Sequence, residues 1–369
     1  MPQHPLPVDL LARATGPKRV RVGLDLDKTL VQPEEAFVAA MVIELSDHVP
    51  IEPIAPWYEL MARDWLRRYD EEWKSDGPTA VLGHGWGFSA HEGLLGPMTL
   101  DGNALIAPGR RDARRAVIDR VRPMAVETLR STAEMMRAAV RPSSASSHAK
   151  QVAADWVIKH AESVVEGVRR RRLDPATELP VLVPGAKGFL EWVKARSELE
   201  PWIGTNGDPQ VQVEGKIADA NRRYPELFTG IPVVVSGEER VDAAKPAEPI
   251  FDAAEAVGPG TDVAMFVDDR HDTGVLGAER RRAAGHKILP VLLDLSGQRL
   301  ASRQNDLRRQ VSGREIAIAT SHADTAAIAE ALSMGADPSD VASHFSVPRA
   351  MDLAGVGEMV GLGRESLSW

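Results

Sequence analysis

Acidic and basic side chains of the kinds that handle phosphate follow several short apolar runs in this sequence. Asp25 and Asp27 come directly after the run VRVGL, and Asp268 and Asp269 end the run VAMFVDD. Lys245 lies between them, in the stretch VDAAKPAEPIF. Carboxylates that crowd together repel one another and resist ionisation. A divalent cation removes that conflict, and hard oxygen ligands with few nitrogens favour Mg²⁺.

These residue types suit the hydrolysis of a phosphate monoester. Mg²⁺ and Lys245 would neutralise both the attacking carboxylate and the phosphoryl oxygens, which otherwise repel each other. Asp25 would attack phosphorus and form an aspartyl-phosphate, while Asp27 would protonate the leaving oxygen and later activate water. Thr205, at the end of the run PWIGTN, would donate a hydrogen bond to a phosphoryl oxygen, beside the N-terminus of the next helix.

The elements that position these residues alternate between strands and helices. Strand-like runs over 20–25, 201–206, 231–236 and 263–269 are separated by helical patterns, and a further strand, KILPVLL, follows. This alternation predicts an α/β fold with a doubly wound, Rossmann-like parallel sheet. The residues that follow each strand then converge on the carboxyl edge of the sheet, where such folds place their sites.

A long interval between the first two strands predicts an inserted, mainly helical domain. Residues 33–75 and 111–172 have helical patterns, whereas residues 76–110 are rich in glycine and proline. The predicted domains are an α/β catalytic core at 18–31 and 176–295, an inserted helical domain at 32–175, and a helical C-terminal tail at 296–369. The preferred interpretation of the tail is a packing or dimerisation appendage. Its stretch ALSMGADPSDVASHFSVPRAMDLAGVG faintly resembles a helix-turn-helix, but it offers few basic side chains to DNA.

Four motifs resemble those of the haloacid dehalogenase superfamily in order and spacing: DLDKTL, GTN, KPAEPIF and FVDD. The resemblance covers residues 20–30 and 180–293. It implies a phosphatase-type hydrolase that uses Mg²⁺, with a C1-type helical cap inserted between the first two motifs. Closure of such a cap would exclude water and select the substrate.

The resemblance also implies the metal ligands. Asp25 would be both nucleophile and ligand, and Asp27 would be the acid/base whose main-chain oxygen also binds the metal. Asp268 would ligate Mg²⁺, and Asp269 would ligate it directly or through water. An acid at the position of Asp27 favours phosphate transfer over cleavage of a carbon–halogen bond.

The remaining candidate site residues are expected to contact the substrate. By the resemblance, Thr205 and Lys245 hold the phosphoryl group. Asn206 and Lys28 are the candidate substrate-binding residues, and Lys28 stands where relatives often have glycine. Two other functions remain open: a phosphomutase of a sugar phosphate, and a non-catalytic binding or regulatory protein that has kept the fold.

Several further side chains have a structural interpretation that we prefer to a functional one. Aromatic residues at helical spacing are expected to form the core of the cap rather than a stacking surface for a sugar or base; these are Trp57, Trp65, Tyr69 and Trp73. The runs 169–172 and 280–282, all arginine, are expected to be solvated. Four residues of the glycine-rich stretch are expected to be ordinary loop residues: His84, His91, Trp86 and Phe88. The alternative for the two histidines is metal binding. The alternative for Trp86 and Phe88 is a role in substrate specificity.

Composition limits the compartment and the partners. The 369 residues carry a net charge of −9 at pH 7 and include no cysteine. This charge argues against binding nucleic acid through overall charge, and disulfides and thiol chemistry are excluded. The chain shows neither a secretion signal nor an apolar run of the roughly 18 residues that span a bilayer. We expect a cytoplasmic protein whose partner is a small phosphorylated metabolite, and homodimer formation through cap or tail is left open.

Overall fold

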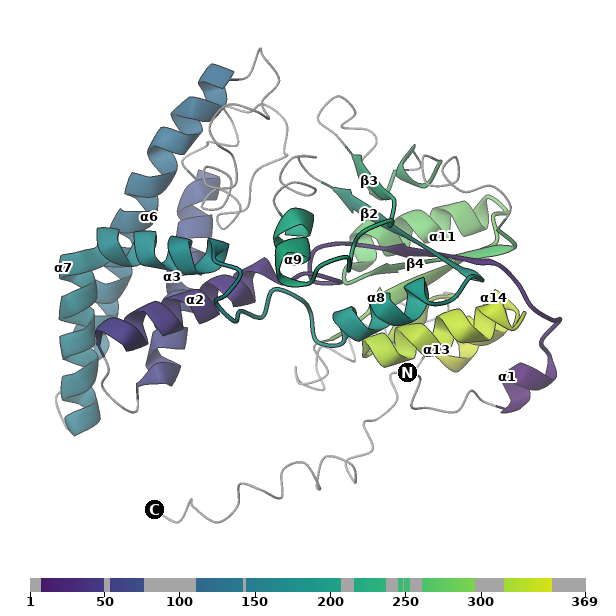
Figure 1. Ribbon diagram of the computed structural model, residues 1–369, viewed down its shortest axis with the longest axis horizontal. Coiled ribbons are helices and arrows are strands. Elements are labelled where there is room, and N and C mark those ends of the chain that lie inside the picture. Colours follow the sequence, from purple (N-terminus) through teal and green to yellow (C-terminus); the bar gives the residue numbers. More distant parts are fainter. Residues whose placement is uncertain are drawn as a thin grey trace. The chain divides into compact units, whose positions relative to one another are not determined.

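The computed structural model describes most of the chain (Figure 1). The described residues are 8–49, 54–75, 111–141, 144–206, 216–236, 245–247, 249–252, 261–295 and 315–346. The glycine-rich stretch with His84, Trp86, Phe88 and His91 lies outside them. Contacts divide the chain into two compact units, residues 23–260 and residues 1–22 with 261–369.

Six strands form one sheet in the order β3-β2-β1-β4-β5-β6. The pairings of β2 with β3, β4 with β5, and β5 with β6 are parallel. The strands are β1 (Val20–Leu24), β2 (Leu199–Asn206), β3 (Val233–Ser236), β4 (Val263–Asp268), β5 (Ile288–Leu293) and β6 (Ala317–Ala319). The predicted α/β fold with a parallel sheet is therefore confirmed.

Helices cover both faces of the part of the sheet that belongs to residues 261–346. Figure 1 shows α11 (Leu276–Ala283) on one side of the strands and α13 (His322–Ser333) with α14 (Pro338–His344) on the other. Every residue of β1 and β5 is buried, as expected for strands covered on both faces. The tail thus contributes a sixth strand as well as helices. The short helix α1 (Val8–Ala12) belongs to the same unit.

Four long helices of the other unit pack against one another as a bundle. They are α2 (Pro33–His48), α3 (Ala55–Ser75), α6 (Arg111–Ala139) and α7 (Ala145–Leu173). Pairwise contacts join α2 to α3 and α7, and α6 to α3 and α7. Sequence signals explain their starts, because Pro33 occupies the first turn of α2 and Ser144 caps α7 by accepting from Ser147 N at 3.2 Å.

Aromatic side chains of α3 fill this bundle, as the sequence predicts. Trp57, Tyr58, Trp65 and Tyr69 are all buried. Trp65 follows the adjacent Trp57 and Tyr58 by eight and seven residues and precedes Tyr69 by four, which places the set on one helical face. The indole of Trp65 donates to the carbonyl of Ala125 at 3.0 Å. The side chain of Trp73 lies outside the described residues. The prediction that the aromatic set forms a core is confirmed for the three described members.

The two segments that join the bundle to the sheet run beside each other. Gln32 N donates to Val181 O at 2.9 Å, and Val183 N donates to Leu30 O at 3.0 Å. The returning chain then forms α8 (Ala186–Lys194), β2 and α9 (Ala218–Arg223). These hydrogen bonds hold the chain just after the Asp25–Asp27 motif.

Among the helices that the structure describes, none is long and apolar enough to cross a membrane.

Candidate active site

Asp25 follows β1 and forms a buried ion pair with Lys245. The Lys245 ammonium donates to Asp25 Oδ1, and the two residues are only 6% and 7% exposed. A buried charge is costly unless it is paired. The pair therefore holds a carboxylate in the interior and places a cation directly on it, which are the two features that the sequence predicts for this position.

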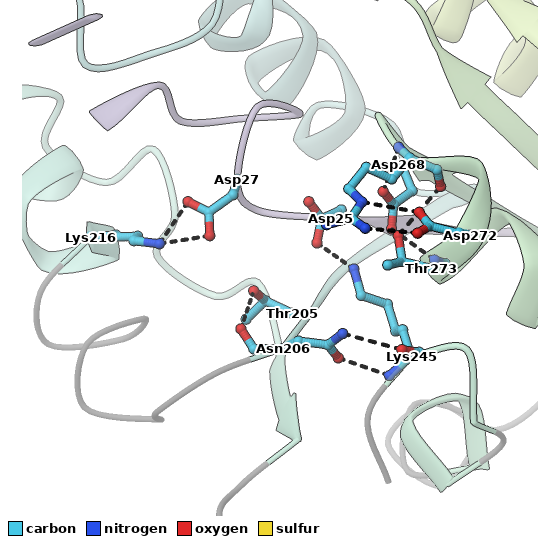
Figure 2. Close-up of polar contacts among 11 residues, drawn as sticks. Asp25, Asp27, Thr205, Asn206, Lys216, Lys245, Asp268, Asp272 and Thr273 are labelled. Carbon is cyan, nitrogen blue, oxygen red and sulfur yellow. Dashed lines mark hydrogen bonds and ion pairs between the residues drawn. The ribbon is translucent and has the colours of Figure 1, made fainter. Parts of the chain in front are cut away.

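Asn206 holds Lys245 through its main chain (Figure 2). The side-chain oxygen of Asn206 accepts from Lys245 N at 2.8 Å, and its amide nitrogen donates to Lys245 O at 3.3 Å. Thr205, beside it at the end of β2, is 1% exposed, and its hydroxyl contacts Asn206 O at 3.3 Å. The expected substrate-binding residue Asn206 thus orients the lysine that pairs with Asp25.

A tight turn follows Asp25 and sets the direction of Asp27. Leu30 N and Val31 N both donate to Leu26 O at 2.9 Å, and Lys28 N donates to Val31 O at 2.7 Å. Lys28 has a φ of 60°, a conformation that glycine adopts more readily. This φ gives a physical reason for the glycine that the resemblance implies at the position of Lys28. The Lys28 side chain is 62% exposed and lies 3.9 Å from Glu34.

Lys216 is a site residue that sequence reasoning missed. Its ammonium lies 2.7 and 2.6 Å from the two carboxylate oxygens of Asp27, and Lys216 is 4% exposed. Figure 2 shows Lys216 and Lys245 directed at different aspartates of the same motif. No sequence signal marks this lysine, because a single lysine in a helical pattern is ordinarily solvated.

Asp268 ends β4 and is held by the loop that follows it. Its Oδ1 accepts from Arg270 N at 2.9 Å, and its Oδ2 accepts from Thr273 Oγ1 at 3.0 Å and Gly274 N at 2.9 Å. A Cβ on Gly274 would lie 2.5 Å from that same Oδ2, so only glycine fits. In the same loop, a hydrogen bond from Arg270 lowers the pKa of Asp272.

The described residues include one acidic group that can hold a metal ion. Asp25, Asp268 and Asp269 each offer a carboxylate oxygen, and these oxygens lie within 4.8 Å of one another. Asp25 and Asp268 are buried and Asp269 is partly exposed. Oxygen-only ligands and buried like charges fit a hard divalent cation such as Mg²⁺. These three side chains are among the metal ligands that the sequence predicts.

Two arginine runs differ from the expectation that they are solvated. Arg172 is 2% exposed, since its guanidinium pairs with Asp219 and lies 5.8 Å from the centre of the Phe37 ring. Burial lowers the pKa of Arg172. Arg281, on α11, is also 2% exposed. A run of arginines in the sequence does not reveal which of them is buried, because successive residues point to different sides of a helix.

Comparisons with known proteins found structures but no sequence relatives. No family model matches the chain, and no curated protein matches it. The chain is similar to the HAD-hydrolase YfnB from Bacillus subtilis, described as bound to magnesium, at 13% identity and a TM-score of 0.33, over 76% of this chain and 88% of that one.

Two further solved structures are similar at the same level. A haloacid dehalogenase-like hydrolase from Burkholderia xenovorans LB400 has 15% identity and a TM-score of 0.36, over 86% of this chain and 99% of its own. A conserved haloacid dehalogenase-like protein of unknown function from Agrobacterium tumefaciens str. C58 has 16% identity and a TM-score of 0.33, over 85% and 98%.

Proposed function

We propose that this protein is a Mg²⁺-dependent phosphomonoester hydrolase of the haloacid dehalogenase type, acting on a small phosphorylated metabolite. The observation that carries the proposal is the buried pair of Asp25 and Lys245, with Asp25 in one acidic group with Asp268 and Asp269. A carboxylate nucleophile needs a nearby cation before it can approach a phosphate dianion. Lys245 supplies one positive charge, and the acidic group is suited to hold a second.

The residues that would hold Mg²⁺ are Asp25, Asp268 and Asp269, with the main-chain oxygen of Asp27. When bound, Mg²⁺ would supply charge neutralisation and Lewis-acid polarisation of the phosphoryl oxygens. The three loop donors on Asp268 support this assignment, since hydrogen bonds from a surrounding shell orient metal ligands and tune their affinity.

The reaction would proceed in two displacements at phosphorus. In the first, a carboxylate oxygen of Asp25 attacks phosphorus, the ester P–O bond breaks, and the leaving oxygen takes a proton from Asp27. In the second, water attacks the aspartyl-phosphate, its proton passes to Asp27, and inorganic phosphate leaves with the Asp25 carboxylate restored. Thr205 and Lys245 would donate hydrogen bonds to the phosphoryl oxygens throughout.

The four-helix bundle is the proposed cap. It is inserted between Val31 and Leu182, directly after the motif that carries Asp25 and Asp27. A cap that closes over such a site would exclude water from the first displacement and select the metabolite. The proposed domain division is a catalytic core at 18–31 and 176–295, a cap at 32–175, and a C-terminal tail at 296–369 that adds β6 to the sheet of the core.

The test is phosphate release from 4-nitrophenyl phosphate and from a panel of small phosphorylated metabolites, with Mg²⁺ and with a chelator. We expect Asp25→Asn to lower kcat by about 10³-fold or more, because the nucleophile is lost, and we expect the chelator to abolish wild-type turnover. Asp155→Asn is the matched control, since Asp155 forms an exposed ion pair with Arg137 in the bundle. It should retain wild-type activity.

Equal activity of the wild type and Asp25→Asn would contradict the proposed mechanism. Conversion of a sugar phosphate to its isomer without free phosphate would instead identify a phosphomutase. Tight binding of a metabolite without turnover would identify a binding protein.

A further inference from the structure

Lys216 is buried at the acid/base residue of the proposed reaction. Its side chain is 3% exposed, whereas the Asp27 side chain is 37% exposed. The ammonium contacts both carboxylate oxygens of Asp27, at 2.7 and 2.6 Å. A buried ammonium is costly without a partner, so this lysine stays with the carboxylate. The aspartate is therefore the member of the pair whose orientation is restricted.

The segment that carries Lys216 is anchored by buried charges of its own. Lys216 immediately precedes Ile217, the residue before α9, and Asp219 and Arg223 follow it at spacings of three and seven residues. These spacings place the three on one helical face. Asp219 pairs with buried Arg172, and Arg223 donates to Arg172 O at 2.7 Å and to Thr177 O at 2.6 Å. The lysine therefore projects from a rigid support.

We propose that Lys216 is a positioning residue that holds the carboxylate of Asp27 at the leaving-group oxygen. This inference rests on the proposed phosphatase function and adds a residue to it. An ammonium has three donors, so it can keep one Asp27 oxygen while the other turns to the substrate. Lys245 serves the nucleophile and Lys216 serves the acid/base, so each aspartate of the motif has its own lysine. General acid catalysis depends on such fixed geometry.

The experiment measures how the rate depends on the leaving group. Poor leaving groups need a proton at the departing oxygen, whereas 4-nitrophenolate departs without one. We expect Lys216→Met to lower kcat for phenyl phosphate about 10-fold more than for 4-nitrophenyl phosphate, a fraction of the 10²–10⁴-fold effect of a general acid. Lys216→Arg, which keeps the charge and donors, should restore part of the loss.

A double-mutant cycle with Asp27→Asn separates positioning from general damage. If Lys216 acts through Asp27, Lys216→Met should cause no further change in leaving-group dependence once Asp27 is replaced. Lys194→Met is the matched control. Its ammonium also makes several contacts in the same unit, to the carbonyls of Glu226, Leu227 and Thr229. We expect it to leave the leaving-group dependence unchanged.

Equal losses for both substrates in Lys216→Met, or additive losses in the cycle, would overturn the proposal and leave Lys216 with a structural role. Circular dichroism checks that the variant folds, and Lys216→Gln replaces it if it does not. A wild type that releases no phosphate from either ester would refute the proposed function itself. That result is distinguishable, because it appears before any variant is made.

Discussion

At the scale of single residues, hydrogen-bond donors decide how each carboxylate of the site is held. Asp25 and Asp27 are held by lysines, whereas Asp268 is held by two main-chain amides and the hydroxyl of Thr273. Gly274 supplies one of these amides at a point where a side chain has no space. A Cβ there would lie 2.2 Å from Phe266 Cε1 and 2.5 Å from Asp268 Oδ2.

Gly274→Ala is therefore expected to weaken Mg²⁺ binding. The added methyl group must displace either the Asp268 carboxylate or the Phe266 ring, and loss of supporting contacts to a ligand costs about 10–100-fold in metal affinity. Isothermal titration calorimetry with Mg²⁺ alone measures the change without relying on turnover.

Gly167→Ala provides the control for overpacking. A Cβ at Gly167 would lie 2.0 Å from Glu44 Oε1 in the helical bundle, so this variant should lose about 1–3 kcal/mol of stability. Its affinity for Mg²⁺ should stay at the wild-type value. Wild-type affinity in Gly274→Ala, or an equal loss of affinity in both variants, would argue against a specific role for the Asp268 loop.

At the scale of elements, the α3 helix combines an apolar face with buried hydroxyl groups. Tyr58 is 2% exposed, and its hydroxyl donates to Val49 O at 2.8 Å. This bond ties α3 to the end of α2. Burial raises the pKa of Tyr58 to about 12, because the phenolate would lose its hydration inside the bundle.

The raised pKa makes the contribution of Tyr58 depend on pH. A group whose pKa is higher in the folded state stabilises the protein fully below its unfolded pKa, near 10 for tyrosine. That contribution is lost as the pH rises from about 10 to about 12. Tyr58→Phe should cost about 1 kcal/mol at pH 7, through the lost hydrogen bond.

The stability difference between Tyr58→Phe and the wild type should shrink as the pH rises through that window. Urea denaturation of both proteins at pH 7, 10 and 11.5 measures it. A difference that stays constant with pH would show that the folded protein does not hold Tyr58 neutral.

At the scale of the whole molecule, a buried cluster of charges joins the bundle to α9 within the unit of residues 23–260. Arg172 lies in the last turn of α7 and pairs with Asp219, and their side chains are 3% and 6% exposed. Arg223 adds an ion pair to Asp219 at 3.6 Å. These ion pairs link α9 to the C-terminal end of α7, where the chain leaves the bundle.

Asp219→Asn is expected to destabilise the protein by about 3–5 kcal/mol, because it leaves buried guanidinium groups without a counter-charge. Asp47→Asn removes a similar contact to Arg171, but Asp47 is 59% exposed, so its loss should cost less than about 1 kcal/mol. Urea denaturation followed by tryptophan fluorescence compares the two variants. Equal, small effects would mean that water reaches the Asp219 cluster.

Much of the site was predictable from sequence because its chemistry is local to strand ends. Asp25, Thr205 and Asp268 each follow or end an apolar run, and parallel strands bring such residues to one edge of the sheet. The helical bundle was equally predictable, since aromatic residues at helical spacing require a buried face. Strands and helices follow from short-range patterns, so the sequence by itself determined the first five strands of the sheet and its α/β class, whereas β6, in the predicted helical tail, required the tertiary structure.

Contacts between segments far apart in the chain required the tertiary structure. Lys216 contacts Asp27, which is 189 positions away in the sequence. The residues next to a lysine do not indicate which distant carboxylate it pairs with. The same holds for Arg172, whose neighbours in an arginine run are more exposed while it alone is buried against Asp219. The two hydrogen bonds between the Asn206 side chain and the main chain of Lys245 also join segments that only the tertiary structure brings together. Sequence patterns determine which face an element buries, but only packing decides which charged groups meet there, because that depends on distances between elements.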